Sequence, residues 1–237
     1  MLKISVISVQ PKMFEGFLTE SIVARAVKKG ACEIDIVDLR EFGEGRWRRV
    51  DDKPYGGGPG MLMKCGPWFA AVESVLGDRT ADGGDRRTRV VMTSPAGRRF
   101  TQRDAEELAK AEHVVFMCGH YEGFDARIET LATDVFSVGD FVLTGGEIPA
   151  AAMVDAVVRL IPGALGAGPV ATADESFGSS GMLEPPQYTH PPSFRGMDVP
   201  EVLLSGDHRR IEAWKRRAAL ERTRRIRPDL AKGGTPC

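Results

Sequence analysis

Three glycine-rich loops carry the clearest chemical signal in the sequence. Ser94–Gly97, Gly119–Gly123 and Val138–Gly146 each follow a segment that is predicted to be a strand. In open parallel sheets ligands bind outside the carboxyl ends of the strands, and glycine lets the backbone approach a ligand closely. None of the three loops contains lysine, which favours an uncharged, nucleoside-like ligand over a triphosphate. A tight turn would explain any one loop, but three together indicate a binding site.

Two other glycine-rich segments are less informative. Residues Gly166–Ala171 match the letters of a dinucleotide-binding GxGxxA motif. That motif requires a strand before it and a helix after it, whereas this segment follows a predicted helix and contains Pro169. Neither a P-loop pattern nor a GxSxG pattern occurs. Tyr55–Gly60 belongs to a long irregular loop of a kind that is usually either functional or disordered.

The elements that would position these loops alternate between strands and helices over the first two-thirds of the chain. Helical spacing of apolar residues predicts one helix over 13–29, a second that begins after the capping residue Thr101, and a third over 147–160. This alternation predicts an α/β fold with a mainly parallel sheet covered on both faces. The predicted strands are Leu2–Val9, Cys32–Asp38, Arg89–Ser94, His113–Cys118 and Asp134–Val138.

The composition changes after Pro162. Residues 163–198 are rich in glycine and proline, and the chain becomes helical and basic from Ser205. Ile211, Trp214, Ala218 and Leu220 form the expected apolar face there. We therefore expect an α/β domain at 1–162, a flexible linker at 163–181 and a small, mainly helical domain at 182–237.

Charge and cysteine usage restrict the classes of function. The 237 residues include 32 Lys and Arg against 33 Asp and Glu. Residues 207–227 hold nine Lys and Arg against three acidic residues, a net of +6, which favours a polyanionic partner. The four cysteines have no zinc-like spacing, so we expect reduced thiols and no metal site. Asp155 and Arg159 interrupt the longest apolar run, so we expect a cytoplasmic protein without a membrane span.

Several long motifs, in order along nearly the whole chain, resemble the bacterial tRNA (guanine-N1)-methyltransferases of the TrmD family. The resemblance implies a SPOUT-class α/β fold with a deep trefoil knot, a homodimer, and S-adenosylmethionine as methyl donor. It implies that the acceptor is the guanosine at tRNA position 37, next to the anticodon, and suggests that Mg²⁺ helps the transfer. The motifs are Val50–Met63, Cys118–Gly123, Ser137–Glu147, Ile161–Gly163 and Leu203–His208.

The resemblance also assigns a role to each domain and to individual residues. Residues 1–162 would bind the donor and 182–237 the tRNA. The implied donor-binding residues are Thr93, Ser94, Pro95, Gly97, Gly119, Tyr121, Glu122, Gly123, Ser137, Val138, Gly139, Asp140, Phe141, Val142, Leu143, Gly145 and Gly146. His120 and His190 stand where arginine is common in the family.

Methylation of guanine at N1 requires a base for the N1 proton and a cation for the charge that builds on O6. In the family an arginine before the Ile-Pro-Gly turn supplies the cation, which implies Arg159 here. The family's base is an aspartate in the linker. Counting from Arg159 gives Asp174, whereas counting back from Ser176 gives Glu175. We assign the base to Asp174, with Glu175 as the alternative.

Two other functions remain open from the sequence. Another knotted RNA methyltransferase, acting on a ribose 2′-hydroxyl or a different base, would share the donor loops. It would not explain the linker carboxylate together with the basic helical domain. A catalytically silent RNA-binding protein would explain the basic stretch alone.

Overall fold

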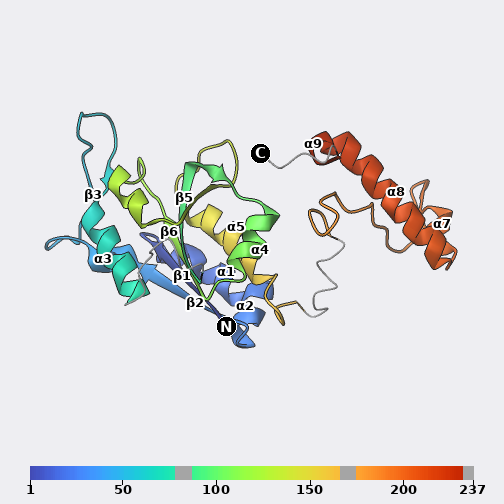
Figure 1. The fold of residues 1–237 in the computed structure, drawn as a ribbon, viewed down its shortest axis with the longest axis horizontal. Helices are drawn as coiled ribbons and strands as arrows, with labels where there is room; N and C mark the ends of the chain where they lie inside the picture. Colours follow the sequence, from blue (N-terminus) through green and yellow to red (C-terminus); the bar gives the residue numbers. More distant parts are fainter. Residues whose placement is uncertain (78–86, 166–174, 232–237) are drawn as a thin grey trace. The chain divides into compact units, whose positions relative to one another are not determined.

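The computed structural model describes residues 1–77, 87–165 and 175–231. The chain divides into two compact units, Met1–Gly168 and Pro169–Cys237. The first unit is built around one five-stranded sheet, and the second contains the longest described helix (Figure 1). Each unit is described separately below.

The central sheet is entirely parallel. Its strands are β1 (Leu2–Ser8), β2 (Cys32–Asp38), β5 (Thr88–Arg99), β6 (His113–Cys118) and β7 (Asp134–Ser137), in the order β2-β1-β6-β5-β7. Every residue of β6 is buried, as expected for a central strand covered on both faces. The mainly parallel sheet predicted from the sequence is therefore confirmed, and the predicted strand bounds agree closely for four of the five strands.

The third predicted strand differs from the expectation. β5 continues to Arg99, and its pairing with β7 shifts register between Thr93 and Arg98. Ser94–Gly97 is therefore a bulge within an extended strand, not a loop that leaves it. Because a Cβ on Gly97 would lie 2.7 Å from backbone atoms of Val135 and Phe136, only glycine fits where the strand resumes pairing.

Helices cover both faces of the sheet. One face carries η1 (Pro11–Phe14), α1 (Glu15–Thr19), α2 (Ser21–Lys28), α4 (Gln102–Leu108) and α5 (Glu147–Val158). The other carries η2 (Leu39–Phe42), α3 (Cys65–Leu76) and η3 (Ala126–Leu131). Figure 1 shows α3 on the opposite side of the sheet from α1, α2 and α5. Neighbouring β1 residues point into different cores, Val6 toward the α5 side and Ile7 toward the α3 side.

One helix prediction was wrong, and one helix was not predicted. The helix expected over 13–29 is interrupted, because Glu20 is extended and Ser21 has a φ of 60°. The Thr19 hydroxyl donates to the Glu15 carbonyl oxygen at 2.9 Å, a local bond that competes with helix continuation. Helix α3 was not predicted at all, because Gly66-Pro67 suggests a turn. Proline is tolerated in the first turn of a helix.

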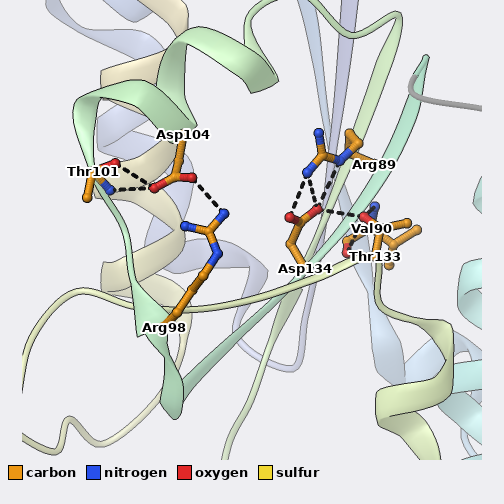
Figure 2. Close-up of polar contacts among 7 residues, drawn as sticks. All are labelled: Arg89, Val90, Arg98, Thr101, Asp104, Thr133 and Asp134. Atoms are coloured by element: carbon orange, nitrogen blue, oxygen red, sulfur yellow. Dashed lines mark hydrogen bonds and ion pairs between the residues drawn. The ribbon is translucent and has the colours of Figure 1, made fainter. Parts of the chain in front are cut away.

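Two ion pairs fix β5 to its neighbours (Figure 2). Arg89 donates to both carboxylate oxygens of Asp134 on β7, at 2.9 and 2.6 Å. Arg98 donates to Asp104 at 2.7 Å, and Asp104 also accepts from the backbone N–H of Thr101 in the predicted capping box. Burial opposes ionisation of Asp104, yet the hydrogen bonds from Arg98 and Thr101 outweigh it and lower the Asp104 pKa.

The second unit contains a two-stranded hairpin, β8 (Ser193–Phe194) and β9 (Met197–Asp198), and the helices α7 (Glu201–Leu204), α8 (His208–Ile226) and α9 (Pro228–Ala231). The Asp207 carboxylate caps α8 by accepting from two backbone N–H groups at 3.1 Å. The predicted apolar face of α8 is half-buried, and Thr223 is fully buried and accepts from the Leu183 N–H at 3.0 Å. Among the helices that the structure describes, none is long and apolar enough to cross a membrane.

Candidate functional site

The three predicted loops line one pocket of about 450 Å³ at the carboxyl ends of β5, β6 and β7. Of the residues predicted to bind the donor, all except Gly97, Gly139 and Asp140 line it. Gly97 packs against β7, and Asp140 is exposed in an ion pair with Arg99 at 2.9 Å. The structure thus brings together three segments that are separate in the chain, within residues 94–146.

The sequence prediction missed part of the pocket wall. Residues 124–126 and Glu129, which lie directly after the loop Gly119–Gly123, also line it. The Asp125 carboxylate accepts from Arg127 at 2.9 and 2.7 Å. These bonds strongly lower the pKa of Asp125. No glycine pattern marks this stretch, and only its continuity with the preceding loop pointed to it.

The loop that ends at Gly146 is held directly against the loop that begins at Gly119. The Gly146 N–H donates to the Gly119 carbonyl oxygen at 2.7 Å, and His120 forms a backbone bridge with Gly145. A Cβ on Gly146 would clash with the Thr93 hydroxyl and would lie 2.7 Å from the Gly119 nitrogen. The pocket therefore depends on glycine at this position because two backbones meet there.

A buried polar chain runs behind the pocket. Glu147 begins α5 and is 2% exposed, and its Oε1 accepts from the Ser8 hydroxyl at 2.7 Å. Its Oε2 lies 3.8 Å from Nδ1 of His120, which has no hydrogen-bond partner within the described ranges. The N-terminus of a helix favours a carboxylate at Glu147. His120, at the end of this chain, also lines the pocket.

The Cys118 thiol lies directly before the loop that begins at Gly119. Cys118 ends β6 and is fully buried. Burial, with the nearby Glu147 carboxylate second, raises the pKa of the Cys118 thiol well above its usual value. The thiol therefore stays protonated, and the pocket has no cysteine nucleophile at this position.

The outer edge of the pocket is apolar and exposed. Phe141 is 56% exposed, Val142 82% and Ile148 58%. Phe141 and Val142 line the pocket, and Ile148 is the second residue of α5. Contiguous exposed apolar side chains of this kind mark interaction surfaces.

The predicted catalytic residues do not all fall within the described part of the chain. Arg159 caps the carboxyl end of α5, where its N–H donates to the Asp155 carbonyl oxygen at 3.2 Å. Asp174 lies outside the described residues. Glu175 belongs to the second unit, and its carbonyl oxygen accepts from the Gly178 N–H at 3.0 Å. The pairing of Arg159 with a linker carboxylate stays a prediction. Over 1–77, 87–165 and 175–231, no three His, Cys, Asp or Glu residues cluster as metal ligands.

Comparison with known proteins agrees with these motifs. The family model described as tRNA (Guanine-1)-methyltransferase TrmD matches residues 2–233. A tRNA (guanine-N(1)-)-methyltransferase of Moorella thermoacetica is 51% identical over 97% of this chain and 90% of its own length. Proteins of the same name from Geobacillus kaustophilus (51% identical, 97% and 91% covered) and Listeria monocytogenes strain EGD-e (49%, 98% and 92%) are similarly close. The chain belongs to the TrmD family of tRNA (guanine-1)-methyltransferases.

Proposed function

We propose that this tRNA (guanine-N1)-methyltransferase binds S-adenosylmethionine in the pocket formed by the three loops and methylates N1 of the guanosine at tRNA position 37. The observation that carries the donor assignment is the convergence of the three loops on one pocket of about 450 Å³. That volume is within the range of small-molecule sites. When bound, S-adenosylmethionine supplies an activated methyl group on a sulfonium, so the carbon needs no further activation.

The charges of the pocket support a cationic ligand. Its wall contains Glu122, Asp125 and Glu129 but no lysine or arginine within the described residues. Asp125 is paired with Arg127, whereas Glu122 and Glu129 form no ion pair within the described ranges. Carboxylates attract an ammonium or sulfonium group and repel phosphates. A donor that carries both cations fits this wall better than a nucleoside triphosphate does.

The acceptor requires acid–base groups from elsewhere in the chain. In this proposal Asp174, with Glu175 as the alternative, accepts the N1 proton. Arg159 stabilises the negative charge that builds on O6. Replacing the base by its amide removes the proton acceptor and nearly preserves its shape. We expect Asp174→Asn to slow single-turnover transfer by about 10²–10⁴-fold with little change in donor affinity, and Glu175→Gln to do much less. Reversed results would identify Glu175 as the base, and normal rates in both variants would remove the linker carboxylate from the mechanism.

The second unit is assigned to tRNA binding. Helix α8 carries most of the +6 stretch, and Arg216, Arg217 and Arg224 on it are exposed. Exposed guanidinium groups along one helix match the phosphates of a folded RNA. In this assignment residues 1–162 form the donor-binding domain, 163–181 a flexible linker and 182–237 the tRNA-binding domain.

The remaining parts of the proposal concern the homodimer, the knot, Mg²⁺ and the location of the enzyme. The exposed edge formed by Phe141, Val142 and Ile148 supports a homodimer that covers it. The trefoil knot and the assistance of Mg²⁺, which the resemblance implies, belong to this proposal. A tRNA substrate supports the expected location in the cytoplasm.

A further inference from the structure

A short hairpin outside the pocket presents an unusual group of side chains. Glu44 and Arg49 exchange two backbone hydrogen bonds of 2.9 Å, and the Arg48 N–H donates to the Gly45 carbonyl oxygen at 3.2 Å. Residues 45–48 therefore form a closed tip with the sequence Gly-Arg-Trp-Arg. We call residues 44–49 the arginine–tryptophan hairpin. It follows η2, which packs against α3 in the first unit (Figure 1).

The base of this hairpin is firmly held. A Cβ on Gly43 would lie 2.8 Å from the Arg48 Cα, so the two ends of the turn are in backbone contact. Lys64 forms a 2.6 Å ion pair with the Glu44 carboxylate. Val50, directly after the hairpin, is fully buried and accepts from the Lys64 N–H at 2.9 Å. The tip is thus held by a fixed base, so the hairpin backbone loses less conformational entropy when a ligand binds.

The side chains at the tip are unpaired and exposed. Trp47 is 75% exposed, whereas Trp68 is fully buried, and the Arg46 guanidinium lies 5.4 Å from the centre of the Trp47 ring. Neither Arg46 nor Arg48 forms an ion pair with any carboxylate in the described ranges. The acidic residue of the hairpin, Glu44, is already paired with Lys64. The tip therefore offers an exposed indole ring with the Arg46 guanidinium over it, and a second cation at Arg48 that pairs with no carboxylate in the described ranges.

The hairpin is also connected to the pocket. The chain passes from Val50 into β3 (Asp51–Asp52), which pairs with β4 (Leu62–Met63). The Met63 N–H donates at 2.9 Å to the carbonyl oxygen of Gly123, which lines the pocket. The hairpin is thus joined to the pocket wall through the β3–β4 ribbon.

We propose that the arginine–tryptophan hairpin is a second RNA-binding surface, on the donor-binding unit, that holds an unpaired base of the substrate. Trp47 stacks on the base, and Arg46 and Arg48 bind the phosphates on either side of it. An exposed aromatic ring flanked by cations is the chemistry that recognises single-stranded RNA, whose bases are free to stack. An acidic protein partner would use the two cations but would not need the ring. The proposal rests on the proposed function, because that function supplies the RNA.

The test measures binding of unmodified tRNA across a range of salt concentrations. Trp47→Ala should weaken binding about tenfold without changing the salt slope, and Trp47→Phe should retain most of the affinity because the ring remains. The Arg46→Ala/Arg48→Ala double variant should reduce the magnitude of the salt slope by about 1.4, for two contacts to single-stranded phosphates. The matched control is Lys28→Ala/Lys29→Ala, which removes two exposed charges from the end of α2 and should leave the slope unchanged.

The outcomes separate this inference from the proposed function. If the wild type methylates tRNA but the hairpin variants bind it like the control, the hairpin inference is wrong and the function stands. If the wild type neither binds nor methylates tRNA, the proposed function itself fails. If Trp47→Ala instead changes the sedimentation of the protein alone, the hairpin is a protein interface and not an RNA surface. Equal urea midpoints across the variants ensure that each difference reflects binding.

Discussion

Gly146→Ala is the most direct test of how the pocket is built. Gly146 has φ −83° and ψ −3°, an ordinary conformation for any residue, so alanine causes no backbone strain there. A Cβ would instead clash with the Thr93 hydroxyl and lie 2.7 Å from the Gly119 nitrogen and 2.9 Å from the Cys118 Cα. The hydroxyl cannot easily move away, because it donates to the Met117 carbonyl oxygen at 3.0 Å. The effect of the substitution is therefore purely steric.

The expected cost follows from these contacts. To relieve the clash, the loop at Gly146 must move away from the end of β6 and lose its 2.7 Å bond to Gly119. A lost hydrogen bond costs about 1 kcal/mol, and forcing an extra methyl group into a packed site costs about 1–3 kcal/mol. The free energy of unfolding should therefore fall by about 2–4 kcal/mol. Donor affinity should fall as well, because the two displaced loops form the pocket wall.

Urea unfolding and calorimetric titration of S-adenosylmethionine measure the two effects. The matched control is Gly16→Ala in α1, where a Cβ meets nothing within 4 Å. Alanine exceeds glycine in helix propensity by about 1 kcal/mol, so the control should be as stable as the wild type or more stable. If Gly146→Ala has the same urea midpoint as the control and binds the donor with wild-type affinity, the close contact between the two loops is not what forms the pocket.

Three further predictions concern the polar framework. Ser8→Ala removes the 2.7 Å bond to the buried Glu147 carboxylate and should lower the free energy of unfolding by about 1–3 kcal/mol, measured in urea. Asp104→Ala should cost about 1 kcal/mol at pH 7 through loss of the α4 cap. Because the Asp104 pKa is lowered in the folded state, its stabilisation is present above the unfolded pKa of about 3.9 and is lost as pH falls further. The urea midpoints of wild type and Asp104→Ala should therefore approach each other as the pH falls below about 3.9. Arg216→Ala and Arg224→Ala should each reduce the magnitude of the salt slope of tRNA binding by roughly one unit. An unchanged slope in both variants would show that these two arginines do not contact the phosphates of the tRNA.

Much of the sheet was predictable because its strands are short segments rich in valine and isoleucine without a competing helical period. His113–Cys118 is buried throughout and Cys32–Asp38 is a half-buried edge strand, and the structure has both with the predicted bounds. The capping box at Thr101 and Asp104 was predictable because it depends only on residues three apart. Strand order was not predictable, since the hydrogen bonds that set it join residues far apart in sequence.

The errors arose where local signals conflicted with packing. Trp68, Ala71, Val72 and Leu76 have the spacing of a buried helix face, but Gly66-Pro67 obscured the start of α3. The helix expected over 13–29 breaks at Ser21, where no glycine or proline signals a break.

In the candidate site, too, the features set by local sequence were predictable, and the contacts between distant elements were not. The glycine loops identified the pocket because glycine is required where backbones meet, as at Gly146. The chain from Ser8 through Glu147 to His120 was not predictable, because its members lie on three separate elements and no motif links them. The exposed Trp47 was not singled out either, since only the fold shows which tryptophan is exposed.

The central claim is that this enzyme transfers a methyl group from S-adenosylmethionine to N1 of guanine 37 in tRNA. The most direct measurement incubates the protein with methyl-labelled S-adenosylmethionine and unmodified tRNA, then digests the RNA and maps the labelled nucleoside. We predict one labelled methyl group per tRNA, on N1 of the guanosine at position 37, and no label in a transcript with adenosine at that position. Label on a ribose 2′-hydroxyl or on another base, or binding of tRNA without any transfer, would contradict the account.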